Sequence, residues 1–194
     1  MRIEIHPTHP QARKVARAVE VRRRGGVVVY PTGTVYGLGC DIHQKKAGER
    51  IYQMRQLKKD HPLSFMCPDL SKIARYAHVD DFAYRIMKRL VPGPYTFVLK
   101  ATRDVPKLLV RKQKTVGIRV PDDSIALALL NELGSPIVSA SATYKGEILN
   151  DPDDLHARFG HADAFVDGGW GGIEPSTVVD LTGDEAAVIR EGAG

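Results

Sequence analysis

Four segments of the sequence place hydroxyl groups, glycines or a cation at the end of a run of residues that favours a β-strand. They are "PTGTVYGLG" at 31–39, "GIRVP" at 117–121, "VSASATYKG" at 138–146, and "DGGWGGIEPSTVVDL" at 167–181 taken with "VIREG" at 188–192. In a sheet flanked by helices, ligands bind beyond strand ends, where loops carry polar side chains over a rigid floor. Hydroxyl and guanidinium groups donate well to phosphate and carboxylate. These segments therefore favour a site that binds anions.

Each of these side chains also has a purely structural explanation. Serine and threonine at strand ends often satisfy neighbouring backbone groups. Ser139, Ser141 and Thr143 alternate with small residues, so their hydroxyls can lie on one side of an extended chain. Arg119 stands in an otherwise apolar strand, where it must either extend to solvent or meet an anion. Taken one at a time, these residues leave both explanations open.

Several common chemistries have no support in the sequence. There is no acidic pair, no histidine and cysteine arrangement for a nucleophile, no Walker loop and no Gly-x-Gly-x-x-Gly fingerprint. Cys40 and Cys67 lack Cys-x-x-Cys spacing, and we interpret them as buried thiols rather than as a disulfide or metal ligands. Binding of phosphate and carboxylate is thus favoured over covalent catalysis.

The pattern of apolar residues predicts one α/β domain that alternates helices with buried strands. Helices are expected at 10–24, 46–57, 69–77, 80–91, 124–134 and 154–160, and strands at 27–31, 63–67, 95–101, 115–121, 136–142, 164–169, 176–181 and 187–194. Asp69 and Ser124 are the expected N-caps. Connections too short for a crossover helix near the C-terminus predict a mixed rather than a wholly parallel sheet. We therefore expect a single-domain, twisted open sheet flanked by helices.

The charge distribution is uneven along a chain of 194 residues with a net charge of +5. Segments 12–24, 55–61 and 110–119 are basic, whereas 151–154 and 183–185 are acidic. Such asymmetry suits an anion-binding surface, although a charged run is also typical of a solvated face. The apolar runs are too short to span a bilayer and the N-terminus has no signal-peptide pattern, so we expect a cytoplasmic protein. We also expect it to be a monomer or a weak dimer.

Eight segments taken in order resemble one known family. They are "GGVVVYPTGTVYGLGCD", "RQLKKDHPLSFMC", "PGPYTFVLK", "TVGIRVPDD", "IVSASATYKG", "DGG", "STVVDL" and "VIREG". The chain resembles the YrdC-type threonylcarbamoyl-adenylate synthases, most closely the YciO-like branch. The resemblance implies a basic concave face and a reaction that joins L-threonine, bicarbonate and ATP, with Mg²⁺ on the nucleotide, to give threonylcarbamoyl-AMP and pyrophosphate. That product supplies the N6-threonylcarbamoyl group of adenosine 37 in tRNA.

The resemblance also implies roles for individual residues. Thr32, Thr34 and Tyr36 would border a threonine and carbamate pocket, in which Arg119 would pair with the carboxylate and Ser139 and Ser176 would hold threonine. Arg55, Lys58, Lys59, Thr115, Ser141, Thr143 and Arg190 would face the nucleotide. Four positions differ from the family pattern, namely Gly33 for an acid, Leu57 for a cation, Met66 for a histidine and Thr143 for an asparagine. Because each lost polar contact is worth roughly 1 to 3 kcal/mol, these differences predict weakened adenylate formation.

A second interpretation is a binding module. The basic concave face could bind the phosphates of double-stranded RNA, tRNA or rRNA, with an affinity that falls steeply with salt. A third is a regulator that binds nucleotide and carboxylate without turnover.

Overall fold

The structure is a computed structural model that describes residues 1–58, 61–110 and 112–194. In this part of the chain, one mixed sheet has the strand order β1-β11-β2-β3-β8-β4-β7-β6-β12-β13, with β5 paired to β6. The strands are β1 Arg2–Glu4, β2 Val28–Tyr30, β3 Gly37–Asp41, β4 Ser64–Met66, β5 Ala77–His78, β6 Tyr95–Ala101, β7 Thr115–Arg119, β8 Ile137–Ser141, β11 Ala164–Asp167, β12 Thr177–Asp180 and β13 Ala187–Arg190. A separate hairpin joins β9 Thr143–Tyr144 to β10 Glu147–Ile148. The predicted single-domain mixed α/β fold is confirmed.

The helices are α1 Ala12–Arg23, α2 Lys45–Met54, α3 Ile73–Tyr76 (preceded by a 3₁₀ turn, Leu70–Lys72), α4 Asp81–Leu90, α5 Ser124–Leu133 and α6 Pro152–Phe159. Asp69 caps the 3₁₀ turn as expected, since its side chain accepts from the Ser71 amide. The prediction of Ser124 as the cap of α5 was wrong. Asp123 is the cap, because its extended backbone lets its carboxylate accept from the amide of Ala126 at 2.8 Å.

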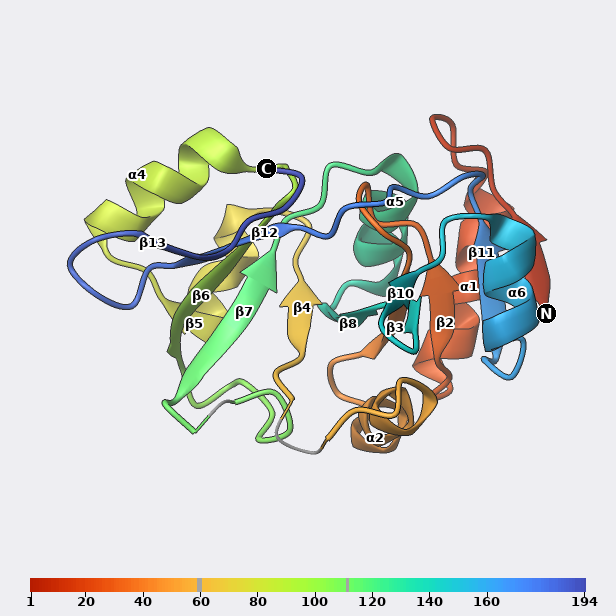
Figure 1. Ribbon diagram of the computed structural model, residues 1–194, viewed down its shortest axis with the longest axis horizontal. Helices are drawn as coiled ribbons and strands as arrows, with labels where there is room; N and C mark the ends of the chain where they lie inside the picture. The colour runs from red at the N-terminus through yellow and green to blue at the C-terminus, as the bar shows by residue number, and fades with distance from the viewer. Residues whose placement is uncertain (59–60, 111) are drawn as a thin grey trace.

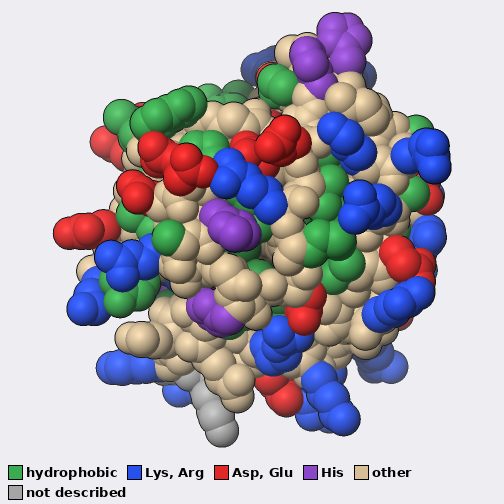
Figure 2. Space-filling view, turned by 90° about the vertical axis from the view of Figure 1, so that its right-hand side faces the viewer, with side chains coloured by type: hydrophobic (Ala, Val, Ile, Leu, Met, Phe, Trp, Pro, Cys, Tyr) green, Lys and Arg blue, Asp and Glu red, His purple; other side chains and the backbone are tan. Residues whose placement is uncertain are grey.

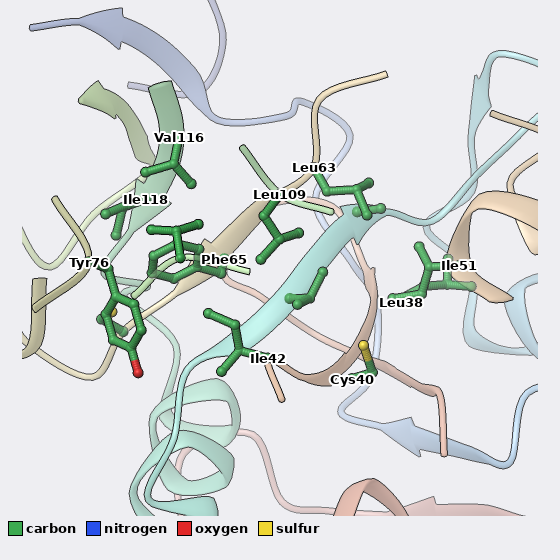
Figure 3. Packing of buried hydrophobic residues seen from close by; sticks show 14 of the residues in the cluster. Leu38, Cys40, Ile42, Ile51, Leu63, Phe65, Tyr76, Leu109, Val116 and Ile118 are labelled. Atoms are coloured by element: carbon green, nitrogen blue, oxygen red, sulfur yellow. The ribbon is translucent and has the colours of Figure 1, made fainter. Parts of the chain in front are cut away.

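The two faces of the sheet carry different hydrophobic clusters. On one face, residues such as Leu38, Cys40, Phe65 and Ile118 form a large buried cluster with Ile51 of α2 (Figure 3). On the other, α1 and α5 pack against one end of the sheet. Their cluster comprises Val15, Ala18 and Val19 of α1, Ile125, Ala126, Leu129, Leu130 and Leu133 of α5, and sheet residues that include Val28, Tyr30 and Ile137.

Beyond α1 and α5, this second face carries only small side chains across its centre. The register pairs Gly39 with Ser139, Ser139 with Ser64, and Ser64 with Gly117, so one row across four strands has no bulky group. A second pair, Gly37 with Ser141, lies beside it. Because alternate residues of a strand point to the same face, the side chains of this row lie side by side on one face of the sheet. Their small size leaves a concave floor there.

Strand β3 was not predicted, because its two glycines are unusual in a strand. The glycines make room for the ring of Tyr30. A Cβ on Gly39 would lie 2.6 Å from the Tyr30 ring, and a Cβ on Gly37 would lie 3.0 Å from the Ser139 hydroxyl. Strands β1 and β5 and the β9–β10 hairpin were also missed, and α2 ends three residues earlier than expected, where the chain turns and Gln56 adopts a φ of 51°.

Figure 1 shows how the chain returns across the sheet. The N-terminus, α1, α6 and β11 lie at one end, and α4 and β13 lie at the other. The connection from β11 to β12 runs between these ends and is bound to the loop after β2, because the Gly172 amide donates to the Thr34 carbonyl at 2.8 Å. No helix in the described ranges has the length and apolar character needed to cross a membrane.

Candidate functional site

Two adjoining hollows open on the small-residue floor of the sheet. The smaller, about 40 Å³, is lined by Thr32, Thr34, Val35, Tyr36, Gly37, Ser64, Met66, Thr96, Arg119, Ser139, Ser141 and Ser176. The larger, about 430 Å³, shares several of these residues and adds Arg55, His61, Pro62, Leu63, Ala140, Thr143, Gly146, Ile148, Pro175, Val178 and Arg190. Their shared walls make one continuous site.

Arg119 is the buried cation of the smaller hollow, and only 4% of it is exposed. Its Nε donates to the Gly93 carbonyl at 3.1 Å, Nη1 to the Thr34 hydroxyl at 2.7 Å, and Nη2 to the Thr32 carbonyl at 2.9 Å. A guanidinium has five N–H groups, so two remain for a ligand. Burial lowers the pKa of Arg119 to about 10, which still leaves it charged at neutral pH. It forms no ion pair with a described carboxylate, so an anionic ligand would complete its coordination.

The hydrogen-bond directions of Thr32 and Thr34 follow from their partners. Thr32 donates its hydroxyl hydrogen to the Val35 carbonyl at 2.7 Å. Thr34 must therefore be the donor in the 3.1 Å contact between the two hydroxyls. Since Thr34 Oγ1 also accepts from Arg119, one lone pair remains, and this oxygen can accept from a ligand amine or hydroxyl.

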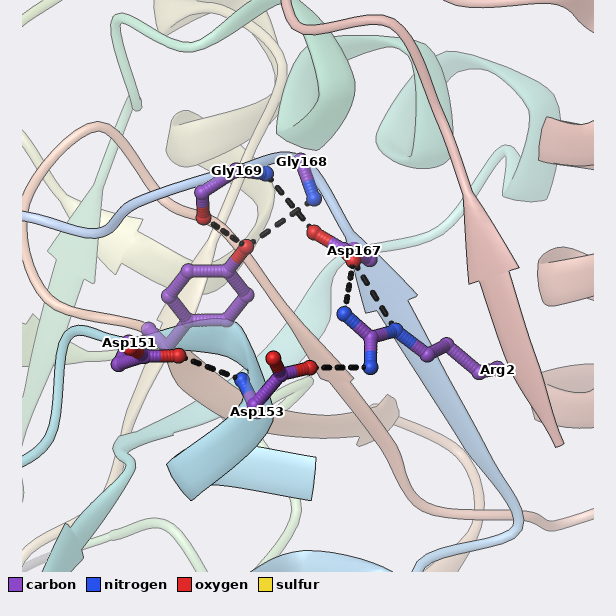
Figure 4. A network of polar contacts seen from close by, with 7 residues as sticks. Arg2, Asp151, Asp153, Asp167, Gly168 and Gly169 are labelled. Carbon is purple, nitrogen blue, oxygen red and sulfur yellow. Dashed lines mark hydrogen bonds and ion pairs between the residues drawn. The ribbon is translucent and has the colours of Figure 1, made fainter. Parts of the chain in front are cut away.

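Tyr36 lines the smaller hollow, while its ring stacks on Phe165 with the centroids 5.8 Å apart and its hydroxyl holds the returning chain. The hydroxyl accepts from the Gly168 amide at 3.0 Å and donates to the Gly169 carbonyl at 2.7 Å (Figure 4). Asp167 fixes the same turn by accepting from the Gly169 amide, and Arg2 holds Asp167 through Nε and Nη2. Burial raises the pKa of Tyr36 to about 12. Tyr36 therefore stays neutral and shapes one wall.

Two guanidinium groups line the larger hollow. Arg55 donates to the Ser141 carbonyl and, at 2.6 Å, to the Thr143 hydroxyl. Arg190 donates through Nε and Nη2 to the Ser176 carbonyl, at 3.2 and 2.6 Å. Burial lowers both pKa values, and neither residue forms an ion pair with a described carboxylate. Two cations without a countercharge, Arg55 half-buried and Arg190 exposed, favour a polyanionic ligand.

Most of the predicted site residues lie together. Thr32, Thr34, Tyr36, Arg119, Ser139 and Ser176 line the smaller hollow, and Arg55, Ser141, Thr143 and Arg190 line the larger one. Thr115 lies at the opposite end of β7 from Arg119 and lines neither. Lys58 is exposed and lines neither, and Lys59 falls outside the described residues.

The sequence reasoning missed Ser64 and Thr96. Both stand in strands that were interpreted only as core, and both line the two hollows. Thr96 lies 2.8 Å from the Ser176 hydroxyl. The available signal was a small polar residue at one position of an otherwise apolar strand.

The four positions that depart from the expected pattern have local explanations. Gly33 has a φ of 78°, and a Cβ there would lie 2.6 Å from the Asp122 carbonyl oxygen, so a side chain does not fit. Leu57 packs against the large apolar cluster. Met66 lies in the cavity wall with its sulfur 3.6 Å from the Tyr30 hydroxyl, and Thr143 accepts from Arg55.

No group of three or more His, Cys, Asp or Glu side chains that could hold a metal ion occurs in the described parts of the chain.

Comparisons with known proteins show the family and the fold of this chain. The Sua5_yciO_yrdC family model, described as "Telomere recombination", matches residues 20–192. The Escherichia coli K12 protein YciO is 47% identical over 98% of this chain and 94% of its own, and the crystal structure of E. coli YciO superposes with a TM-score of 0.96.

Two further relatives have names that state an activity or a ligand. The threonylcarbamoyl-AMP synthase of E. coli O157:H7 is 32% identical over 94% of this chain and 97% of its own. P. abyssi Sua5, solved in complex with L-threonine, is 30% identical with a TM-score of 0.93, and the match covers 99% of this chain and 57% of Sua5. This chain therefore belongs to the Sua5/YciO/YrdC family.

Proposed function

We propose that the protein condenses L-threonine, bicarbonate and ATP into threonylcarbamoyl-AMP and pyrophosphate. The observation that carries the proposal is Arg119, a buried cation with unused N–H groups beside the Thr34 lone pair. Together these supply a donor for a carboxylate and an acceptor for an amine, the two charged groups of an amino acid. The kinship to threonylcarbamoyl-AMP synthases and to a threonine-binding Sua5 supports the same assignment.

The proposed reaction has two steps. The threonine nitrogen attacks the carbon of bicarbonate, and loss of water gives a carbamate. A carbamate oxygen then attacks the α-phosphorus of ATP, the bond to the β-phosphate breaks, and pyrophosphate leaves. We expect Ser139 and Ser176, which lie in the shared wall, to donate to the carbamate, and Arg55 and Arg190 to offset the charge that develops on the phosphates. Mg²⁺ accompanies ATP as part of the substrate.

The positions that depart from the family pattern determine how fast we expect adenylate formation to be. Leu57 packs against the apolar core, and Lys58 is exposed outside the hollow, so among the described residues Arg55 and Arg190 are left to neutralise the triphosphate. We expect turnover slower than that of relatives with a further cation, since a lost charged contact costs about 1.5 to 3 kcal/mol. The product would serve as the threonylcarbamoyl donor for adenosine 37 of tRNA.

The assay incubates purified protein with ATP, bicarbonate and L-threonine, and measures pyrophosphate together with the adenylate by mass spectrometry. We expect pyrophosphate release that requires all three substrates. A rate equal to the blank without protein would overturn the proposal, and pyrophosphate release that continues without L-threonine would identify a simple ATP hydrolase.

A second candidate is binding of double-stranded RNA, and a groove distant from the hollows favours it. This shallow groove, about 1110 Å³, is lined by Arg75, Arg103, Lys107 and Lys114, and its one acid, Asp104, pairs with Arg75. By contrast, the end that carries α1 and α6 mixes basic with acidic side chains (Figure 2). A surface of exposed cations in a groove suits a phosphate backbone.

Filter binding of a 20-base-pair RNA between 50 and 200 mM salt tests this candidate. We expect an affinity that falls steeply with salt and that drops further in the pair Arg103→Gln and Lys107→Gln. The control is Arg13→Gln, which removes a charge from the exposed side of α1. Equal retention of all three proteins, or no retention at all, excludes the groove as an RNA site.

A further inference from the structure

Arg22 is a fully buried cation that the proposed chemistry does not yet use. It lies on α1 with no exposed surface, and none of its three guanidinium nitrogens has a hydrogen-bond partner within the described residues. A buried charge without a partner is costly, because desolvation is uncompensated. Such a group calls for an explanation. Arg22 lines neither hollow itself, but it is connected to the smaller one through Tyr30 and Ser139.

The guanidinium lies against the ring of Tyr30. Its central carbon is 4.5 Å from the ring centroid, a cation–π arrangement that a dry environment strengthens. Tyr30 has no exposed surface either, and its ring lies over Gly37 and Gly39, where a Cβ would approach it to 3.4 and 2.6 Å. The two glycines therefore fix the ring between α1 and the cavity floor.

The Tyr30 hydroxyl reaches the wall of the smaller hollow. It donates to the Ser139 hydroxyl oxygen at 3.1 Å, with the Met66 sulfur at 3.6 Å as a second, weaker acceptor. Because Ser139 accepts this hydrogen bond, its own hydrogen is left to be donated to a ligand. Hydrogen bonds in such a chain strengthen one another.

We propose that Arg22 is a positioning residue of the site, whose buried charge acts through Tyr30 to hold Ser139 as a donor toward an anionic group in the smaller hollow. A cation on the ring face draws electron density from the phenol, which makes its O–H a stronger donor to Ser139. Ser139 in turn becomes a stronger donor to the ligand. The charge also adds directly to the positive potential of Arg119. Arg22 itself touches no ligand, and the inference rests on the proposed binding of threonine and carbamate.

If Arg22 has this role, its replacement should weaken the binding of L-threonine without lowering the thermal stability of the protein. Arg22→Met keeps the length and apolar stem of the side chain but removes the unpaired charge. Its melting temperature should stay equal or rise, whereas its affinity for L-threonine should fall roughly tenfold, the size expected when a hydrogen bond to an anion loses part of its strength. A purely structural role would lower both quantities together.

Titration calorimetry with L-threonine and thermal melting are measured on the same set of proteins. Arg22→Lys, which retains a charge, should restore most of the affinity. Arg13→Met removes the same charge from the exposed side of α1 and should bind like the wild type. If Arg22→Met fails to fold, Tyr30→Phe takes its place, since it deletes only the hydroxyl that donates to Ser139 and should show the same loss.

The outcomes separate this inference from the proposed function. If the wild type does not bind L-threonine, the proposed function fails and the role of Arg22 falls with it. When the wild type binds and Arg22→Met or its substitute Tyr30→Phe binds equally well, only the role of Arg22 is overturned. Weaker binding by Arg22→Met with an unchanged or higher melting temperature supports both, and weaker binding with a lower melting temperature contradicts the positioning role.

Discussion

Arg119 and Thr34 meet through a hydrogen bond of 2.7 Å that joins the end of β7 to the loop after β2. The two residues are 85 positions apart in the chain, and the contact fixes both halves of the candidate amino-acid pocket. The arginine presents remaining donors on one side, and the threonine presents a remaining lone pair on the other.

Replacing Arg119 by lysine should uncouple its charge from its geometry. Lysine keeps the positive charge but cannot reach Gly93, Thr32 and Thr34 at once, because its three donors sit on a single nitrogen. We expect affinity for L-threonine to fall at least tenfold, as calorimetry would show. Arg103→Lys, on the exposed distant groove, is the control. An Arg119→Lys protein with wild-type affinity would mean that the fork geometry is irrelevant.

Thr34→Val tests the acceptor side. Valine has the same shape but leaves an Arg119 N–H unpaired and removes the lone pair offered to the ligand amine. We expect about 2 kcal/mol less binding free energy, or roughly 30-fold weaker binding of L-threonine, together with a lower melting temperature. Thr34→Ser keeps the hydroxyl and should retain most of the affinity. Equal binding by the valine and serine variants would argue against this contact.

Gly33 should resist any side chain, for both conformational and steric reasons. Its φ of 78° strains an L-residue, and a Cβ would lie 2.6 Å from the Asp122 carbonyl. We expect Gly33→Ala to destabilise the fold by about 3 kcal/mol in urea unfolding.

Gly134→Ala is the matched control for Gly33→Ala. Gly134 has a φ of 75°, and nothing lies within 4 Å of the place that a Cβ would take, so only the conformational cost of about 1 kcal/mol applies. Similar losses in the two variants would show that the close approach to Asp122 is not the cause.

The buried thiols should make stability fall at alkaline pH. Burial raises the pKa of Cys40 and Cys67 from 9.0 to about 12. Between pH 9 and 12 the folded chain keeps these protons while the unfolded chain releases them, so the free energy of unfolding falls as pH rises. The slope is about 1.4 kcal/mol per pH unit for each thiol.

Urea unfolding at pH 8 to 10.5 measures this slope. Cys67→Ala should be less stable at every pH because of the cavity that it leaves, but its stability should fall less steeply above pH 9. Val116→Ala, from the same apolar cluster, should lose stability and keep the wild-type slope. Identical slopes for wild type and Cys67→Ala would show that the thiol does not titrate as described.

The fold class and most of the site could be predicted from the sequence because both depend on local patterns. Short β-branched runs such as 27–31 indicate buried strands. An arginine inside an apolar strand must either extend to solvent or meet an anion, and the structure shows that Arg119 is buried. Strand β3 could not be predicted in this way. Its glycines serve the ring of Tyr30, which stands earlier in the chain on the neighbouring strand, so the reason for them is tertiary.

Contacts distant in sequence explain the remaining differences. Thr115 has a suitable hydroxyl, but only the position of β7 in the sheet decides that it lies at the wrong end of the strand. Ser64 reaches the cavity because the register aligns it with Gly117, and Thr96 because the missing side chain of Gly117 leaves room for its methyl group, which would lie 3.4 Å from a Cβ there. No single strand reveals either contact. The buried position of Arg22 within a basic helix likewise depends on how α1 packs.

A crystal structure of the protein soaked with L-threonine and ATP tests the central claim most directly. The account predicts the threonine carboxylate within hydrogen-bonding distance of Arg119, its amine beside Thr34 Oγ1, and the triphosphate between Arg55 and Arg190. Threonine bound away from Arg119, or clear density for ATP with the smaller hollow empty at saturating threonine, would contradict it.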